Sequence, residues 1–508
     1  MPDLPFPFPW LRRATAAPPR PTRTWTWVLP PLAILAFLAT GAGEVHAHTG
    51  PVTAAGAGFF GPTGAVVQTA ESVTDLASRL RGLLGLGLLA LAAWALSANR
   101  RRIPWRVVLW GLALQFIFAV LILRTPFGAG VFDTANHVIL AAVGFTLEGA
   151  TFLFGDLVWN NVPVGTGDPG NAGFAEEGQY VARTGAFVAF NVLPTIIFFA
   201  SVMTVLYHLG IMQRVVGGIA WVMQRTMRTS GAETLSAAGN IFVGQTEAPL
   251  LIKPFVDGMT RSELMAVMTG GFATVAGGVM AAYAGMLVGF FPDIAGHLMA
   301  ASLMSAPAAL VVAKLMVPET EESETAGKLK TELERPDVNV IEAAARGAGE
   351  GLQLALNVGA MLLAFLALIA LLNGILGWAG GLVGFEQLSL EGILGWLLAP
   401  VAWVMGVTWE DAASVGSLMG LKTVATEFVA YLGLADSMAA GELSPRSATI
   451  ATYALSGFAN FSSIAIQIGG IGGIAPRRRQ DLARLGLRAM IGGSIAAFMT
   501  AAIAGVLI

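Results

Sequence analysis

Long apolar runs, separated by short polar segments, make up most of the chain. Several runs approach the ~20 residues that a helix needs to cross the hydrocarbon core of a bilayer. Eight of them are strong, at about 80–98, 105–123, 185–207, 264–290, 294–317, 351–376, 445–470 and 483–508. The pattern predicts a helical membrane protein with several crossings, because a helix satisfies its own backbone hydrogen bonds inside lipid.

Arginine and lysine gather in four clusters between these runs, and such clusters stay on the cytoplasmic side of a membrane. An even number of crossings must therefore separate each cluster from the next. The clusters lie at 100–106, 214–228, 328–346 and 477–479. This parity leaves one further apolar stretch, 137–155 with Glu148, without a crossing, and we predict that it lies in the membrane interface. The amphipathic stretch 211–229 is predicted to lie in the interface on the cytoplasmic side.

Parity also predicts two re-entrant hairpins, each of which enters and leaves the membrane by one face. The first spans about 231–257, because two strong runs already connect the clusters on either side of it. The second spans about 411–435, where Lys422 and Glu427 make a full crossing costly. The stretches 388–407 and 417–434 could both cross the membrane, but the two ionisable groups in the second favour a hairpin there. The two hairpins would enter from opposite faces.

The hairpins and the runs that follow them form an internal repeat. Residues 243–247, VGQTE, match residues 424–427, VATE, and residues 271–274, GFAT, match residues 457–460, GFAN. Gly277 and Gly278 in one run, and Asn460, Ser462 and Ser463 in the other, favour an interruption of the helix. Because the hairpins enter from opposite faces, the repeat is inverted, which is typical of secondary transporters with a site at the repeat interface. The predicted fold class is an all-α polytopic membrane protein with eight transmembrane helices plus two re-entrant hairpins in inverted repeats.

The domain organisation follows from these features. Residues 1–47 read as a signal sequence cut after Ala47 or as an uncleaved signal anchor. The remaining segments are an extracytoplasmic linker at 48–79, N-terminal helices with the interfacial helix at 80–184, a first repeat at 185–317 with its broken helix at 264–290, a charged cytoplasmic loop at 318–346, and a second repeat at 347–508 with its broken helix at 445–470 and a C-terminal helix.

Composition narrows the class of protein further. Hydrophobic residues make up 55% of the 508, charged residues make up 12%, and the mean hydropathy is +0.70. A soluble chain could not bury that much apolar surface. The net charge of −3 argues against a nucleic-acid partner. The absence of cysteine excludes disulfides and thiolate chemistry, and the five histidines lack the spacing of metal ligands.

The polar residues inside the apolar runs point to a binding site. A buried carboxylate costs about 2.5–3.5 kcal/mol on insertion scales, and Glu247 and Glu427 both carry that cost. They could merely pair with Lys253 and Lys422, and their polar neighbours taken singly could serve helix–helix hydrogen bonding. As a set related by the repeat, they favour binding instead. Carboxylates, amides and hydroxyls without an arginine suit a neutral ligand with several hydroxyls and a flat ring, such as a sugar joined to a base.

Four long motifs then identify a family. GNIFVGQTEAP, TEFVAYLGL, SGFANFSSIAIQIGGIGGIAPRRR and LALNVGAMLLAFLALIALLNGILG closely resemble the concentrative nucleoside transporter family over about residues 80–508. The resemblance implies eight membrane-spanning helices plus two hairpins, split into a scaffold and a mobile transport domain and assembled as a homotrimer. The N-terminal helices of 80–184 would then belong to the scaffold. Residues 1–79 have no counterpart.

The resemblance also implies roles for individual residues. The nucleobase would be faced by Gln245, Thr246 and Glu247, with Val279 packed on it and Phe458 along its side. The ribose hydroxyls would be held by Glu427, Asn460 and Ser463. A sodium ion would lie at Asn240, Val243, Thr274 and Val275, with the valines acting through their carbonyls. Thr426 departs from the asparagine that the family usually has there, which leaves the support of Glu427 open.

The predicted function is therefore a sodium-coupled nucleoside symporter of the cell membrane that imports nucleosides by alternating access, with sodium as coupling ion and no other cofactor. A proton-coupled transporter is one alternative, although the QTEAP form and the hydroxyl of Thr274 resemble the sodium-coupled members. A membrane-embedded hydrolase or a passive channel are alternatives from other classes. No GxSxG or HExxH motif supports an enzyme, and an asymmetric site does not suit a channel.

Overall fold

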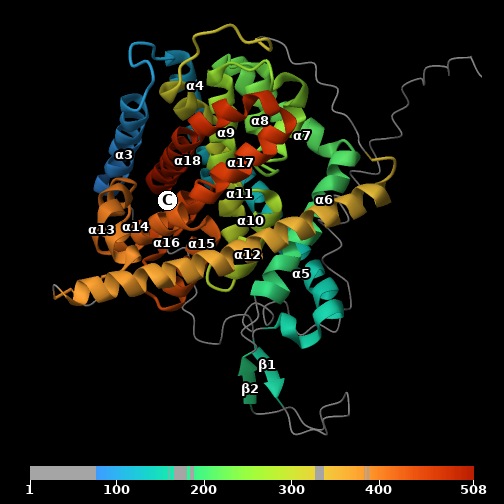
Figure 1. Ribbon diagram of the computed structural model, residues 1–508, viewed down its shortest axis with the longest axis vertical. Helices are drawn as coiled ribbons and strands as arrows, with labels where there is room; N and C mark the ends of the chain where they lie inside the picture. The colour runs from blue at the N-terminus through green and yellow to red at the C-terminus, as the bar shows by residue number, and fades with distance from the viewer. Residues whose placement is uncertain are drawn as a thin grey trace, which may run out of the picture. The chain divides into compact units, whose positions relative to one another are not determined.

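The described residues of the computed structural model are almost entirely helical (Figure 1). They are 76–159, 161–164, 180–183, 188–326, 337–382, 384–385 and 388–508. The predicted signal region, 1–47, and nearly all of the predicted linker, 48–79, lie outside them. The helix α3 begins at Leu76, a few residues before the apolar run that predicted it.

Eight helical segments are long and apolar enough to cross a membrane, judged by length and composition within the described residues. They are Ala77–Ala95, Trp105–Arg124, Gly130–Val158, Val188–His208, Arg261–Leu287, Ile294–Met316, Val340–Gly381 and Pro476–Leu507. The protein is therefore a multi-pass membrane protein. Seven of the segments coincide with predicted runs. The eighth, Gly130–Val158, contains the stretch 137–155, so its interfacial placement stays a prediction.

The N-terminal half contains most of the peripheral elements. In chain order these are α3 (Leu76–Ala95), α4 (Trp105–Arg124), α5 (Pro126–Phe154), η4 (Gly155–Val158), β1 (Asn161–Val164), β2 (Tyr180–Arg183), η5 (Val188–Val192), α6 (Leu193–His208) and α7 (Ile211–Met227). The strands β1 and β2 pair antiparallel, with Asn161 opposite Arg183. This short hairpin is a feature that the all-α prediction did not include.

The rest of the chain alternates long helices with short, interrupted ones. In chain order these are α8 (Gly231–Gly239), η6 (Ala248–Phe255), α9 (Arg261–Ala273), α10 (Gly277–Leu287), α11 (Ile294–Met316), α12 (Val340–Gly381), α13 (Leu390–Val404), α14 (Trp409–Val424), α15 (Glu427–Ala439), α16 (Pro445–Leu455), α17 (Phe461–Ile474), η7 (Pro476–Arg478) and α18 (Arg479–Leu507). The helices α13 and α14 meet at 118°, so they do not form one straight crossing.

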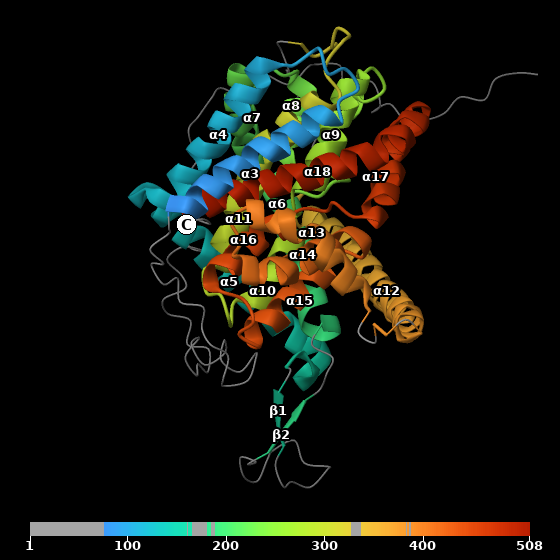
Figure 2. The same cartoon turned by 90° about the vertical axis from the view of Figure 1, so that its left-hand side faces the viewer.

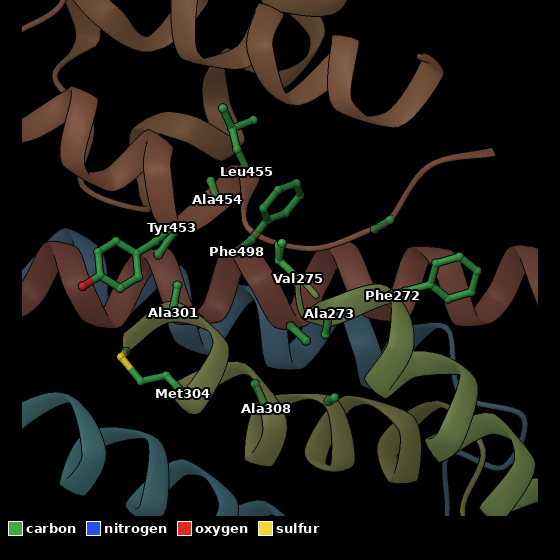
Figure 3. Packing of buried hydrophobic residues seen from close by; sticks show 14 of the residues in the cluster. Phe272, Ala273, Val275, Ala301, Met304, Ala308, Tyr453, Ala454, Leu455 and Phe498 are labelled. Carbon is green, nitrogen blue, oxygen red and sulfur yellow. The ribbon is translucent and has the colours of Figure 1, made fainter. Parts of the chain in front are cut away.

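Burial divides the helices into a core and a sheath. Most of the apolar stretch is buried in α9–α10 and α11 (89%) and in α18 (78%), against 22–33% in α3, α4, α5, α6 and α12. Figure 2 shows α18 running past α9 and α11 inside the bundle, and Figure 3 shows Phe272, Met304 and Phe498 in the packed core. A helix whose apolar side chains face outward requires lipid or a partner subunit around it.

Glycines allow the closest helix contacts, as is usual in membrane bundles. On α12, a Cβ at Gly351 would lie 2.8 Å from the Cα of Ile197, and one at Gly347 would lie 2.7 Å from the carbonyl oxygen of Ala200. In the core, a Cβ at Gly493 would lie 2.3 Å from that of Phe272. These contacts fix α12 against α6 and α18 against α9.

Two helices are interrupted at matching places. The chain leaves the helix at 274–276, between α9 and α10, and at 456–460, between α16 and α17. The amide of Gly277 donates to the carbonyl of Phe242, 3.0 Å away, and Gly457 has φ +132° with its Cα facing the carbonyl of Phe272. The interruptions therefore lie next to each other.

A strap at one end of the bundle closes over the starts of α8 and α9. The Lys314 ammonium contacts Glu233 at 2.7 Å and Glu319 at 3.2 Å, and the Glu233 and Lys314 side chains are buried. Thr325 accepts from the amide of Ala232 at 3.2 Å, and Ser323 donates to Glu263. Residues 318–326, which we call the strap, thus satisfy backbone and charged groups at the first turns of both helices.

Substitution of Gly457 should destabilise the fold. Alanine there would adopt an unfavourable positive φ and place its Cβ 2.7 Å from the carbonyl oxygen of Phe272, at a cost of about 1–3 kcal/mol. We expect Gly457→Ala to lower the melting temperature of the purified protein. Gly469→Ala on α17, where a Cβ meets nothing within 4 Å, is the control. Equal melting temperatures for the two variants would contradict the requirement for glycine at position 457.

Candidate substrate and ion site

The first cluster of predicted site residues lies in a turn between α8 and η6. A capping box of Ser230 and Glu233 starts α8, and the helix ends at Gly239, where the chain turns through residues 240–247. The turn closes on itself, because the amide of Gly244 donates to the Glu247 carboxylate at 3.0 Å. This turn, which we call the first tip, holds Asn240, Val243, Gln245, Thr246 and Glu247.

Glu427 begins α15 and is held by two donors from other helices. The Tyr283 hydroxyl on α10 donates to its Oε1 at 2.8 Å, and the Asn460 amide donates to its Oε2 at 2.8 Å. The Glu427 side chain is only 5% exposed. Its two oxygens retain further acceptor capacity, since a carboxylate can accept about four hydrogen bonds.

Asn460 acts as the N-cap of α17, and this fixes its amide. Its Oδ1 accepts from the Ser463 amide at 2.8 Å and from the Ser462 hydroxyl at 2.7 Å. Because the oxygen is used by the cap, the NH2 group points to Glu427. Thr426 in turn caps α15 by accepting from the amide of Val429 at 3.4 Å, so the support of Glu427 comes from Tyr283 and Asn460.

Gln245 joins the first tip to α17. Its Nε2 donates to the Ser463 hydroxyl at 3.1 Å, and its Oε1 accepts from Gln467 at 3.0 Å. Gln467 also donates to the carbonyl of Met268, 3.1 Å away. The structure thus connects Gln245 to Ser463, and Ser463 through Asn460 to Glu427, in one network that joins residues more than 200 positions apart.

The remaining predicted substrate residues surround this network less directly. Val279 is buried and Phe458 is partly buried against the core. Thr246 packs on α17, where a Cβ at Gly470 would lie 2.7 Å from its methyl group. Glu247 is exposed, and its carboxylate accepts from the amide of Gly244 within its own turn.

The two lysines do not neutralise the carboxylates directly. The Lys422 ammonium donates to the carbonyl of Ala454 at 2.9 Å, and Lys253 is exposed. Within the described part of the chain, neither lysine forms an ion pair with Glu247 or Glu427. Simple ion pairing therefore does not explain why the carboxylates are there.

The predicted ion ligands lie where the first tip meets the interruption of α9. Asn240 is fully buried, and neither atom of its amide has a hydrogen-bond partner. The Thr274 hydroxyl, also buried, donates to the carbonyl of Gly270 at 2.9 Å, and Val243 and Val275 are buried. A buried amide without a partner is costly unless a ligand satisfies it. The donor set, oxygen from amide, hydroxyl and carbonyls, fits a hard cation such as sodium.

Sequence reasoning missed Tyr283 and Gln467. Each follows a predicted site residue by four positions, Val279 in one case and Ser463 in the other, and residues four apart share a helix face. That spacing could have identified both.

These features define a class: a helical multi-pass membrane transporter with its polar site at two adjoining helix interruptions. Comparison with known families agrees. Residues 84–157 and 297–505 match the Na+ dependent nucleoside transporter N-terminus and C-terminus, and residues 189–290 match a domain described as Gate, nucleoside recognition.

Individual relatives cover most of the chain. A protein of Haemophilus influenzae described as an uncharacterized transporter is 45% identical over 85% of this chain and 98% of its own. Sodium/nucleoside cotransporter 1 of Mus musculus is 40% identical over 87% of this chain and 66% of its own. The solved structure of CNTnw in an inward-facing substrate-bound state has 42% identity and a TM-score of 0.74, over 85% of this chain and 98% of that one. The chain belongs to the concentrative nucleoside transporter family.

Removal of the Tyr283 hydroxyl should weaken the fold around Glu427. Tyr283→Phe deletes one of two donors to a buried carboxylate, and hydrogen bonds to charged groups contribute about 1.5–3 kcal/mol. We expect a lower melting temperature. Tyr207→Phe is the matched control, because the Tyr207 hydroxyl is buried without a partner. A similar loss in both variants would reject a specific role for the Tyr283–Glu427 bond.

Proposed function

We propose that the protein is a sodium-coupled nucleoside symporter that imports nucleosides by alternating access. The observation that carries the proposal is the placement of Glu427. This buried carboxylate is held between Tyr283 and Asn460, and the same network reaches the first tip through Ser463 and Gln245. Family membership supports nucleosides as the substrate class and sodium as the ion.

The architecture we propose consists of two re-entrant hairpins in an inverted repeat. The first is α8, the first tip and η6, and the second is α14 and α15 with its tip at 425–426. Each is followed by an interrupted helix, α9–α10 after the first and α16–α17 after the second. The equivalent positions Thr274 and Asn460 both lie where a helix stops or restarts, which supports the repeat. Irregular backbone at membrane depth is tolerated only where it is buried in protein or lines a cavity.

The nucleoside would lie between the two tips. The ribose hydroxyls would donate to Glu427 and bond with Asn460 and Ser463. A carboxylate with free acceptor sites suits vicinal hydroxyls, which are donors. The nucleobase would face Gln245, Thr246 and Glu247, with Val279 and Phe458 as apolar neighbours.

Sodium would bind at Asn240, Thr274 and the carbonyls of Val243 and Val275. An ion there would connect the first tip to the start of α10, beside the bond from Gly277 to Phe242. It would therefore order the first tip before the nucleoside binds. This order makes nucleoside affinity dependent on sodium, which is the requirement for coupling.

The driving force is sufficient for concentration. One inward sodium ion contributes about 2.3 kcal/mol at 100 mV, and a tenfold sodium gradient adds about 1.4 kcal/mol. Together they allow accumulation of a few hundredfold.

The movement we propose separates a scaffold from a transport domain. The buried helices α9, α10, α11 and α18, with the two hairpins and α16–α17, would form the transport domain, and the sheath of α3–α6 and α12 would form the scaffold. Related CNTnw structures described as inward-facing and outward-facing support such a cycle. The outward apolar side chains of α6 and α12 suit the contacts of a homotrimer and lipid.

Flux measurements in proteoliposomes test the function. We expect radiolabelled uridine to accumulate above equilibrium under an inward sodium gradient. A proton gradient without sodium should not replace it. Uridine that only equilibrates would indicate a channel, and chemical alteration of uridine would indicate an enzyme. Competition by a panel of nucleosides, free bases and ribose would then define the substrate preference.

Loss of the Glu427 charge should abolish uptake. Glu427→Gln replaces an acceptor with a side chain that also donates, so it no longer accepts from two ribose hydroxyls and from Tyr283 and Asn460 together. We expect uptake to fall at least about a hundredfold, in line with buried charged hydrogen bonds of 1.5–3 kcal/mol each. Glu442→Gln, in an exposed turn, should transport normally. Near-normal uptake by folded Glu427→Gln protein would remove Glu427 from the site.

Substitution of Thr274 should change the sodium dependence. Thr274→Ala removes one proposed oxygen ligand, so we expect the sodium concentration for half-maximal uptake to rise. Thr269→Ala on the same helix deletes a buried hydroxyl that has no partner and lies against Gly492 of α18; its sodium curve should match that of the unmodified protein. An unchanged curve for Thr274→Ala would place the ion elsewhere.

A further inference from the structure

A cavity between the start of α4 and the end of α7 gathers hydrogen-bond donors. Its volume is about 720 Å³, and it is lined by Arg106, Trp221, Gln224, Arg225, Arg228 and Thr229. Each of these side chains can donate a hydrogen bond, three are cationic, and no carboxylate lines the cavity. A neighbouring cavity shares Arg228 and Thr229 with this one and differs in its acidic lining, which includes Glu319, Glu321 and Glu322.

Among the residues that the structure describes, the arginines at this cavity lack carboxylate partners, whereas Thr229 shares a hydrogen bond with Thr234 at 2.7 Å and the Arg225 guanidinium lies 6.0 Å from the centre of the Trp221 ring. Across the described residues, none of the three arginines forms an ion pair. Arg106 donates its Nε to the carbonyl of Thr226 at 3.0 Å, which leaves its terminal amino groups for another acceptor. The amide nitrogen of Gln224 is buried without a partner.

Arg228 occupies an unusual backbone conformation at this cavity. It ends α7 with φ 56° and ψ 36°, and no other described non-glycine residue has a positive φ. Glycine is the residue that adopts this conformation at a helix end without strain. Arg228 in this conformation places a third guanidinium at the cavity. A glycine at this position would leave only two.

Exposed apolar side chains occur at the cavity and on the adjoining part of α4, where Trp221 lines this cavity and Trp105 lines the neighbouring one. Trp221 on α7 is 63% exposed, and Trp105 and Leu109 on α4 are each 62% exposed. Tryptophan beside arginine is typical of the headgroup level of a bilayer. The opposite face of α7 is buried through Met212, Val216 and other residues spaced one turn apart, as in a helix lying in the interface. The acyl chains of a lipid can pack against these apolar side chains, whereas a free inorganic anion cannot.

We propose that this cavity binds the phosphodiester headgroup of an anionic phospholipid. Arg106, Arg225 and Arg228 contact the phosphate oxygens, and Trp221 lies along the glycerol and acyl region. The lipid thereby joins α4 to the end of α7, two residues before Ser230 caps α8. The base of the first hairpin is thus anchored to the membrane surface. The site does not depend on the transported substrate or on the coupling ion.

Lipid retention and thermal stability of the full chain test the proposal. The protein is purified into nanodiscs of phosphatidylcholine with or without phosphatidylglycerol, and co-purified lipid is measured by mass spectrometry. We expect enrichment of phosphatidylglycerol and a higher melting temperature in its presence. The double variant Arg225→Gln/Arg228→Gln should bind it at least about tenfold more weakly, since charged hydrogen bonds contribute at least that factor each.

Two further variants distinguish a specific lipid site from general electrostatic attraction between the protein and anionic lipid. Arg101→Gln/Arg214→Gln removes the same charge from two arginines that do not line this cavity, and should retain the enrichment. Arg228→Gly relieves the backbone strain, so it should fold at least as stably in phosphatidylcholine while losing much of the gain from phosphatidylglycerol. Equal enrichment in all variants overturns the proposal. Inorganic phosphate that reproduces the thermal gain overturns the lipid as ligand.

Discussion

Backbone polar groups inside a membrane must find partners, and this requirement governs the centre of the protein. The chain interrupts two helices next to each other, and other segments approach both interruptions closely. The amide of Gly277 bonds to the first tip, and Gly457 lets the second interruption approach the carbonyl of Phe272. Asn460 serves both purposes, because its oxygen caps α17 and its nitrogen holds Glu427. The site exists because these interruptions are paired.

The sequence predicted the elements that depend on local pattern. Apolar length predicted seven of the eight long apolar helices, and the glycine pair and Asn460 lie where α10 and α17 begin. The motifs around Gln245 and Glu427 predicted the family. These features succeed because run length, helix-breaking residues and buried charge are each visible within about 20 residues of sequence.

What the sequence did not predict depends on contacts between distant segments. Tyr283 donates to Glu427 across 144 positions, and Gln467 reaches Met268 across 199. Each looks like an ordinary helix residue until the fold brings the partners together. The separation of Glu247 from the Gln245 network has the same origin, since the turn at Gly244 decides which way each neighbouring side chain points. Composition alone does not decide whether the long helix α5 crosses the membrane, because an interfacial helix and a membrane-spanning helix can have the same hydropathy.

The strap holds the starts of α8 and α9 against the end of α11. Lys314 and Glu233 form a buried ion pair, to which the partly exposed Glu319 adds a second carboxylate, and removing one partner of a buried pair costs about 3–5 kcal/mol. The start of α8 is therefore bound to α11, whereas the first tip follows the other end of α8. A ligand bound at the first tip, as we propose, would therefore not detach α8 from the bundle. A movement of the tip would move α8 and α11 together.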